Sequence, residues 1–325
     1  MNMSIPALDV VITSWLERCE ELVSDKKHAP ERAGREDVGQ ERRRARAVSD
    51  ALYVEFGSGE PSGVARRTFY IDTAAGPLRI DEYRPRDSMA DFLPAHLLLH
   101  GGAFRLGAID ERINVAFCAQ RAMDSGYAVY SLEYRLAPEH PFPAALDDAR
   151  WALEWLQREA GELRLDANTI VVGGVSAGGC IAASLVIECR DSQGPTVAGL
   201  LLEVPVVDVS DNGAWLQEYA ALNGFSTLSD LRGEYSAGRS PEEPGVSPLR
   251  ADLRNLPPVH VMTAEFDPLR KGGEEFVPKL REAGNRVSAT RHLGQLHGSH
   301  GLLKDLRSAR LWHAEVAAVL RDFAS

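Results

Sequence analysis

The chain contains 325 residues, of which 44% are hydrophobic and 26% are charged. This apolar content is enough for a substantial buried core, and it excludes a disordered chain, a collagen-like fibre and a small disulfide-stapled scaffold. The 36 basic and 47 acidic residues leave a formal net charge of −11, so the average surface repels nucleic-acid phosphates and anionic lipid headgroups. We therefore expect no nucleic-acid partner.

The cysteines and the first residues point to a reduced, cytoplasmic environment. The chain has four cysteines, without the C-x-x-C spacing of a metal site or the density of a disulfide framework, and we expect them to be small core residues. The N-terminal sequence lacks the basic and apolar regions of a secretion signal, and no apolar stretch reaches the ~18 residues needed to span a bilayer. The sequence thus predicts a cytoplasmic protein without stable membrane insertion.

The predicted elements begin with two contrasting segments. Apolar residues at helical spacing predict an amphipathic helix over residues 6–24 that docks on the body of the protein. Residues 24–46 are charged and poor in apolar side chains, which is typical of a solvated linker or an exposed helix. Within that segment, the run Glu41–Arg44 indicates a salt-bridged face rather than a binding patch.

After Tyr53 the pattern changes to strands. Residues 66–72 and 76–85 predict a hairpin with its turn at 74–77. Strands then alternate with helices; we expect strands at 96–100, 127–134, 169–175, 199–208, 257–267 and 286–293, and helices that start at Asp110, Pro143, Ala177 and about Asp305, with one more ending at Gly284. Continuous apolar runs in this alternation predict an α/β fold: a mostly parallel central sheet flanked by helices.

The passage 209–248 interrupts this alternation. It is polar, contains Gly and Pro, and is too long for an ordinary connection, as functional or lid-like insertions are. We expect it to form a helical cap together with the N-terminal segment. The predicted organisation is therefore an N-terminal cap segment at 1–50 and a main α/β domain at 51–325, with 209–248 as a cap insertion.

The most informative stretch runs from a buried strand into Gly174–Gly178. A Ser at a sharp strand-to-helix turn needs small neighbours, and Gly174 and Gly178 provide them. The turn also places Ser176 at a helix N-terminus, where backbone N–H groups favour developing negative charge. We expect Ser176 to be a nucleophile, with Ala177 contributing an amide.

An earlier strand ends in His100-Gly101-Gly102-Ala103. Residues without bulky side chains let the backbone approach a ligand and point N–H groups at it, as an oxyanion hole requires. The amides of Gly102, Ala103 and Ala177 are the expected donors. His100 is expected to fix the loop by hydrogen bonding rather than to act as a base.

Four motifs in this order resemble the hormone-sensitive-lipase-like carboxylesterases of the α/β-hydrolase superfamily. They are HGGAF, YRLAPEH followed by PFPAALDDA, GVSAGG, and Asp267-Pro268-Leu269, within about residues 70–300. The resemblance implies the α/β-hydrolase fold and a catalytic triad, a role for Gly101 in shaping the oxyanion hole, and a bracing role for the YRLAPEH stretch. It is also compatible with a homodimer formed through the final strand and helix.

Two residues depart from the family pattern. Ala103 replaces the third glycine of HGGG, and Val175 replaces the Asp that commonly precedes the nucleophile. Alanine keeps its backbone N–H, so the hole survives if the local backbone is allowed to a residue with a Cβ. Val175 removes a carboxylate beside the nucleophile, and we expect it to alter pH dependence or acyl preference.

The acid and the base should follow the nucleophile in the order Ser, acid, His. Asp267 lies directly after an apolar strand, with Asp208 as its main rival, and Glu265 on the opposite strand face is less suitable. His297 lies in the Gly294–Gly298 loop, which resembles the base loop of the family. His300 is its competitor, and His292, within the last strand, is expected to be structural.

The sequence therefore predicts a serine carboxylesterase that acts on a small-molecule ester through Ser176, His297 and Asp267, without a metal or an organic cofactor. The same machinery could cleave an amide, carbamate or lactone, because one fold hosts all of these reactions. A non-catalytic hormone-receptor-like module is the alternative from another class. A lipid-interface lipase is disfavoured because the chain shows no obvious apolar lid helix.

Overall fold

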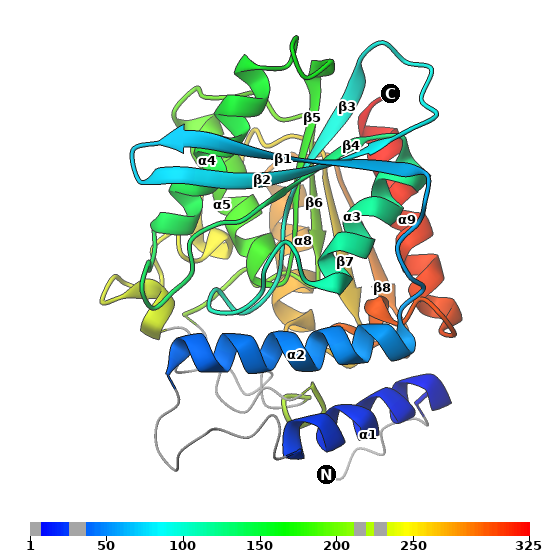
Figure 1. Ribbon diagram of the computed structural model, residues 1–325. Helices are drawn as coiled ribbons and strands as arrows, with labels where there is room; N and C mark the ends of the chain where they lie inside the picture. Colours follow the sequence, from blue (N-terminus) through cyan, green and yellow to red (C-terminus); the bar gives the residue numbers. More distant parts are fainter. Residues whose placement is uncertain (1–7, 26–36, 211–218, 224–232) are drawn as a thin grey trace.

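The computed structural model describes residues 8–25, 37–210, 219–223 and 233–325. Its centre is one eight-stranded sheet in the order β1-β2-β4-β3-β5-β6-β7-β8 (Figure 1). β2 runs antiparallel to both of its neighbours, β1 and β4. All the strands that follow in this order, from β4 through β3 to β8, are parallel to one another. The strands are β1 (Val64–Thr73), β2 (Gly76–Pro85), β3 (Leu93–Leu99), β4 (Ala128–Leu132), β5 (Leu165–Val175), β6 (Gly199–Glu203), β7 (Val259–Ala264) and β8 (Val287–His292).

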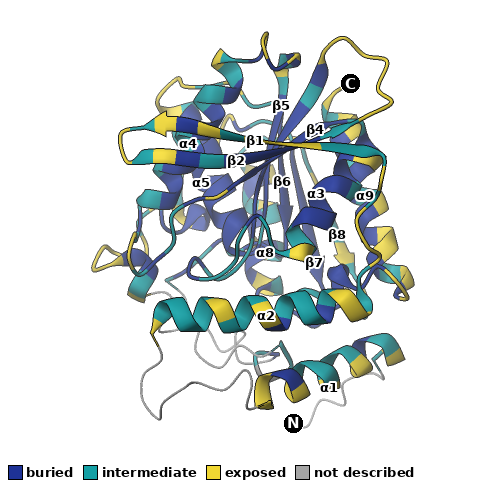
Figure 2. Cartoon of the chain, in the orientation of Figure 1, coloured by how far each residue is buried: buried dark blue, intermediate teal, exposed yellow. Residues whose placement is uncertain are grey.

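Helices cover both faces of the sheet. One face packs on α4 (Ala144–Arg158), α5 (Ala177–Asp191) and α8 (Arg270–Glu282), and the other on α3 (Arg112–Ser125) and α9 (Arg307–Phe323). Because both faces are covered, β4, β6 and β7 are buried along their whole length and β5 is buried from Ile170 to Gly174, so the middle of the sheet is dark blue in Figure 2. This explains the continuous apolar runs in the sequence and confirms the predicted fold class.

Two helices near the N-terminus lie outside these layers. They are α1 (Val10–Ser24) and α2 (Val38–Phe56), and they lie side by side below the sheet in Figure 1. The helix predicted at 6–24 is present from Val10 to Ser24, with Asp9 as its N-cap, and Ile12 is its fully buried anchor. By contrast, the charged segment belongs from Val38 onward to a helix that continues to Phe56, so the expected boundary between residues 50 and 51 falls inside α2.

The rest of the expected cap is described only in part. In the 209–248 insertion, residues 211–218 and 224–232 lie outside the described residues. The described parts include the short 3-10 helix η1 (Ala221–Asn223), and a second one, η2 (Pro248–Arg250), follows the insertion.

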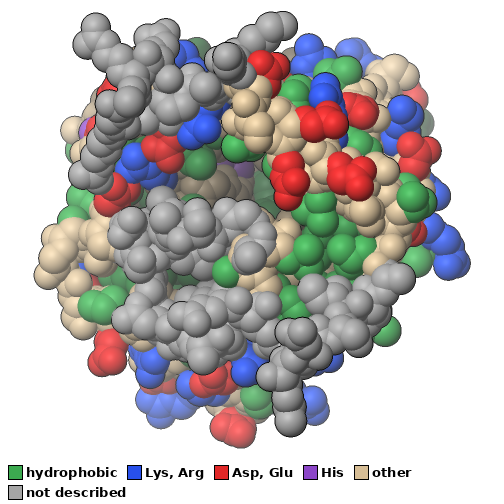
Figure 3. Space-filling view, turned by 90° about the horizontal axis from the view of Figure 1, so that it is seen from below, with side chains coloured by type: hydrophobic (Ala, Val, Ile, Leu, Met, Phe, Trp, Pro, Cys, Tyr) green, Lys and Arg blue, Asp and Glu red, His purple; other side chains and the backbone are tan. Residues whose placement is uncertain are grey.

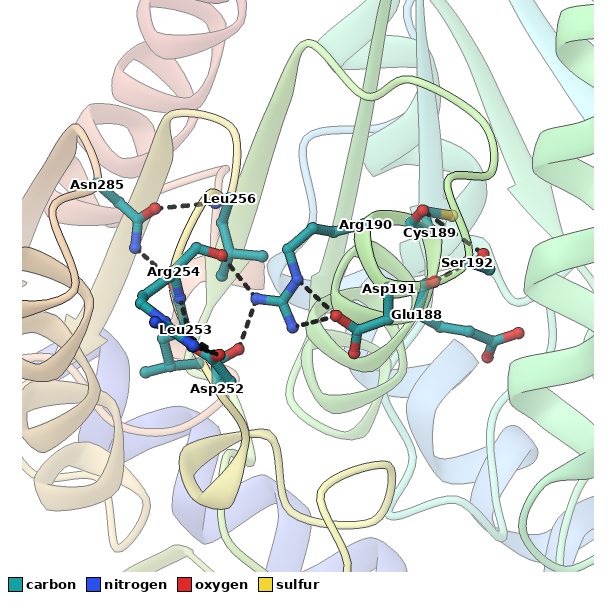
Figure 4. Close-up of polar contacts among 10 residues, drawn as sticks. All are labelled: Glu188, Cys189, Arg190, Asp191, Ser192, Asp252, Leu253, Arg254, Leu256 and Asn285. Atoms are coloured by element: carbon teal, nitrogen blue, oxygen red, sulfur yellow. Dashed lines mark hydrogen bonds and ion pairs between the residues drawn. The ribbon is translucent and has the colours of Figure 1, made fainter.

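A polar network fixes the end of α5 (Figure 4). Arg190 donates from Nη1 to the carbonyls of Asp252 and Arg254, at 2.6 and 2.7 Å. Nearby, the Asn285 amide donates to Leu253 O (2.6 Å) and accepts from Leu256 N (2.9 Å). With 15 residues, α5 is about 22 Å long, so this network lies a full helix length from Ser176 and braces the fold there.

The described residues carry neither a membrane-spanning helix nor a cluster of metal ligands. No helix among them is both long and apolar enough to cross a bilayer. They also hold no group of three or more His, Cys, Asp or Glu side chains placed to share a metal ion. All four cysteines are free; Cys118, Cys180 and Cys189 are core residues as expected, whereas Cys19 is only partly buried.

Candidate active site

Ser176 lies at the tight turn that joins β5 to α5. Its backbone has φ 55° and ψ −115°, a conformation that a residue with a Cβ seldom adopts. A Cβ on Gly174 would lie 2.2 Å from the backbone of Gly178, and one on Gly178 would lie 2.1 Å from the carbonyl O of Leu99. The turn therefore requires glycine at both positions. It presents Ser176 at the first turn of α5, where the helix dipole favours negative charge.

Three predicted residues meet at the carboxyl edge of the sheet. Ser176 Oγ lies 3.1 Å from His297 Nε2, and His297 Nδ1 lies 2.9 Å from Asp267 Oδ2. Asp267 is 2% exposed, and its second oxygen accepts a hydrogen bond from the backbone N–H of Leu269 at 2.7 Å. Since a carboxylate can only accept, the imidazole donates from Nδ1 and offers Nε2 to the serine hydroxyl.

The two other candidate acids, Asp208 and Glu265, contact other residues. Asp208 pairs with Arg250 at 2.6 Å and bonds to Ser210; although burial opposes ionisation, these hydrogen bonds lower the pKa of Asp208. Glu265 accepts the backbone N–H of Gly294 at 2.7 Å. Neither rival takes the place of Asp267 beside His297.

The rival histidines belong to the packed interior. His300 is 3% exposed and stacks on Trp312 with ring centroids 5.0 Å apart, and burial lowers its pKa well below the usual value. His292 contacts Glu315 at 2.9 Å. Of these histidines, His297 alone lies against Ser176 Oγ in the described structure.

The expected oxyanion loop follows β3 and lies against Ser176. A Cβ on Gly101 would lie 3.4 Å from Ser176 Cβ, and three successive residues have positive φ: Gly102 (128°), Ala103 (53°) and Phe104 (64°). Among the described residues, no protein acceptor takes a hydrogen bond from the amides of Gly101, Gly102, Ala103 or Ala177. Four backbone N–H groups near the nucleophile are thus left for a ligand.

The predicted brace for this loop is present. His100 donates from Nδ1 to Gly101 O (2.7 Å) and stacks on Tyr134, whose hydroxyl donates to His100 O (2.7 Å). Burial lowers the pKa of His100 to about 4, so the ring is neutral at physiological pH. In the same stretch, Arg135 pairs with the buried Asp148 at 2.8 Å. His100 therefore holds the loop, as its position in the sequence predicted.

A cavity of about 250 Å³ opens at Ser176. It continues into a larger cavity of about 640 Å³ that lies between α1, α2 and the body of the protein. The two share five lining residues, Ala45, Ser49, Leu106, Ile113 and Gly298. Figure 3 views this side of the molecule, where hydrophobic side chains lie among charged ones. The larger cavity is mostly apolar, so it suits the carbon skeleton of a substrate.

Two polar residues of the site were not predicted from the sequence. The amide of Asn223 accepts from the backbone N–H of His297 (2.8 Å) and donates to the carbonyl of Phe266 (2.8 Å), so it joins the loops that carry the base and the acid. Glu111 lines the cavity at Ser176 and accepts a hydrogen bond from Ser49 at 3.2 Å. The sequence carried no signal for either, because Asn223 lies in the polar insertion and Glu111 in the turn before α3.

The chain is similar to known proteins across most of its length. Residues 96–301 match the family described as alpha/beta hydrolase fold. Esterase LipI of Mycobacterium tuberculosis is 34% identical over 245 residues, which cover 71% of this chain and 73% of LipI. An arylesterase of Saccharolobus solfataricus is 33% identical over 258 residues, covering 76% of this chain and 79% of that protein.

Solved structures extend the likeness to the whole fold. The hyperthermophilic esterase of the archaeon Pyrobaculum calidifontis has a TM-score of 0.80 and 34% identity, covering 89% of this chain and 94% of that chain. An ester-hydrolase from the Lake Arreo metagenome has a TM-score of 0.87 and 28% identity, covering 98% and 100%. The chain therefore belongs to the α/β-hydrolase fold, within its hormone-sensitive-lipase-like carboxylesterase family.

Proposed function

We propose that the protein is a serine carboxylesterase that hydrolyses small-to-medium acyl esters through an acyl-enzyme intermediate. The observation that carries the proposal is the continuous chain of contacts from Ser176 Oγ through His297 to the buried Asp267. The esterases and carboxylesterases among its relatives support the same reaction class. The cytoplasmic location and the homodimer stay predictions.

The geometry suits the two halves of such a reaction. His297 Nε2 takes the proton of Ser176 as Oγ attacks the ester carbonyl, and Asp267 stabilises the imidazolium that forms. The tetrahedral oxyanion accepts hydrogen bonds from the amides of Gly102, Ala103 and Ala177. The intermediate collapses, and the alcohol leaves with the proton from His297. Water, deprotonated in turn by His297, then cleaves the acyl-enzyme and frees the acid.

Ala103 stays an expected donor of the oxyanion hole, together with Gly102 and Ala177. Gly101 and Gly102 line the cavity at Ser176, and the amides of Ala103 and Ala177 follow directly after Gly102 and Ser176 in the chain. Ala103 adopts the left-handed conformation and keeps its backbone N–H, so the replacement of the family's third glycine leaves a donor at this position.

Replacing Ser176 tests the proposal. We expect Ser176→Ala to lower kcat toward p-nitrophenyl butyrate by a factor approaching ~10⁶, because the triad residues act as a unit. Ser184→Ala, which removes a buried hydroxyl from the same helix, is the matched control and should keep most of the activity. Retention of more than a few per cent of activity in Ser176→Ala would rule out this nucleophile. A parallel assay with the corresponding p-nitroanilide would distinguish an esterase from an amidase.

A further inference from the structure

The polar face of α2 lies along the segment that contains the oxyanion loop. Arg46 donates to the carboxylate and to the carbonyl of Asp110, at 2.9 and 3.2 Å. One turn later, Ser49 bonds to Glu111, and Asp50 accepts the first free N–H of α3 from Arg112 at 2.9 Å. These contacts hold one end of the segment 101–112, where α3 begins.

The other end is held by Arg42. Its guanidinium donates to Arg105 O (2.8 Å) and Ala137 O (2.9 Å), and it forms a two-pronged pair with Glu139 at 2.9 and 2.7 Å. One side chain from α2 thereby joins the oxyanion loop to the YRLAPEH stretch. Because the guanidinium is charged, its hydrogen bonds to these four oxygens are stronger than those of a neutral donor. A lysine could not replace it, because an ammonium group lacks the planar, forked arrangement of donors.

Arg105 adds a second connection. This side chain belongs to the loop itself and is 8% exposed, and it contacts Glu41 of α2 at 2.6 Å and Glu234 of the insertion. Next to it, the ring of Phe104 stacks on Tyr235 with centroids 3.7 Å apart. The two segments that the sequence assigns to a cap thus meet at this loop.

The loop needs such support because of its backbone. Ala103 and Phe104 both have positive φ, a strained conformation for a residue with a Cβ that persists only where its surroundings stabilise it. The amides of Gly101 and Gly102 precede this turn directly, so a relaxation of the turn moves them. A displacement of about 1 Å at a catalytic group can lower the rate by roughly 10²-fold.

We propose that α2 acts as a splint for the oxyanion loop, with Arg42 and the Glu41–Arg105 pair as positioning residues for the transition state. The inference rests on the proposed esterase function, and it assigns α2 a part in rate as well as in substrate binding. Arg42 touches no reacting atom. It acts through the carbonyls that fix the turn after Gly102.

Three variants, Arg42→Gln, Arg42→Lys and Glu41→Gln, and one control test the splint. Arg42→Gln removes the two-pronged pair, and Glu41→Gln weakens the contact to Arg105 without removing a large side chain. Arg43→Gln is the matched control, because Arg43 is the next residue on α2 and is exposed. The assay measures kcat and KM for a p-nitrophenyl ester, the rate of inactivation by a small alkyl phosphonate, and the melting temperature of each variant.

We expect Arg42→Gln to lower kcat and the phosphonate inactivation rate by about 10- to 100-fold, with KM changed less than about threefold. Glu41→Gln should show the same pattern more weakly, Arg42→Lys should recover only part of the loss, and Arg43→Gln should match the wild type.

If Arg42→Gln fails to fold, the kinetics of Glu41→Gln decide whether the proposal holds. Unchanged kcat in the decisive variant, or a rise in KM alone, would overturn the splint. Because Ser176→Ala tests the nucleophile separately, either proposal can fail without the other.

Discussion

Ser176 depends on the absence of side chains around it. Gly174 and Gly178 leave the space in which the strand turns into α5, and any Cβ there would meet backbone atoms at about 2 Å. The two departures from the family pattern fit this backbone differently. Ala103 occupies the left-handed region, which is less favourable for alanine than for glycine. The replacement nevertheless keeps the backbone N–H at this position. Val175 places an apolar side chain at the cavity, where the family commonly has a carboxylate.

Glu111 places a carboxyl group in this cavity, and its protonation should affect the stability of the fold. Burial raises the pKa of Glu111, with further increases from Asp50 and Asp110 that Ser49 and Arg46 oppose. A carboxyl with a raised folded-state pKa stabilises the fold at low pH and loses that contribution as pH rises through the folded pKa. We therefore expect Glu111→Gln to raise the melting temperature at about pH 7.5 by a few degrees, and the gain to vanish near about pH 4.

Glu139 offers a control at the same two pH values, because its replacement should shift the melting temperature in the opposite direction. Its hydrogen bond to Arg42 lowers the pKa of Glu139, so Glu139→Gln should lower the melting temperature at neutral pH and lose the effect in acid. If Glu111→Gln lowers the melting temperature at neutral pH, as Glu139→Gln should, the argument from burial at Glu111 is wrong.

The local sequence pattern correctly predicted the helices and strands whose residues are almost all buried. The strand from Thr169 to Val175 and the helix after Ser176 were predictable because both are almost entirely buried. By contrast, α2 carries few apolar anchors, chiefly Val48 and Leu52, and its charged face is satisfied by residues 60 to 100 positions away. Such pairings depend on the folded chain, and composition alone describes them as a solvated segment.

The insertion provides the clearest case of a role that only the tertiary structure reveals. Asn223 is one polar residue in a polar stretch, yet its amide bridges His297 N and Phe266 O. We expect Asn223→Ala to lower kcat by about tenfold with little change in KM, because two backbone groups beside the base and acid lose their partner. Steady-state kinetics with a p-nitrophenyl ester would measure the change.

Asn285→Ala is the matched control for that experiment. The Asn285 amide makes comparable backbone hydrogen bonds in the network of Figure 4, but at the far end of α5. This variant should lower the melting temperature and leave kcat unchanged. Equal losses of kcat in the two variants would mean that Asn223 contributes to stability alone.

For the whole molecule, net charge affects which substrates reach the site. The chain carries −11, and the cavities at α2 are lined by Glu41 and Glu111 against Arg44. We expect kcat/KM for an anionic ester, such as a succinate monoester, to rise a few-fold between about 10 and 150 mM salt as the repulsion is screened. A neutral ester of the same size, assayed in parallel, should show no such rise. A flat response for both would mean that local positive charge guides the anion.

The position of Ile12 has a consequence for the order in which the site is completed. Its side chain is buried in one cluster with Leu296, Leu302 and Leu306, which flank the loop of His297. During synthesis α1 is made early, but the surface that covers Ile12 exists only once residues 296–306 have been added. Contacts so distant along the chain slow folding more than they lower stability. We therefore expect the first helix and the catalytic base to take their places in the same late step of folding, so that a partly made chain holds the nucleophile without its base.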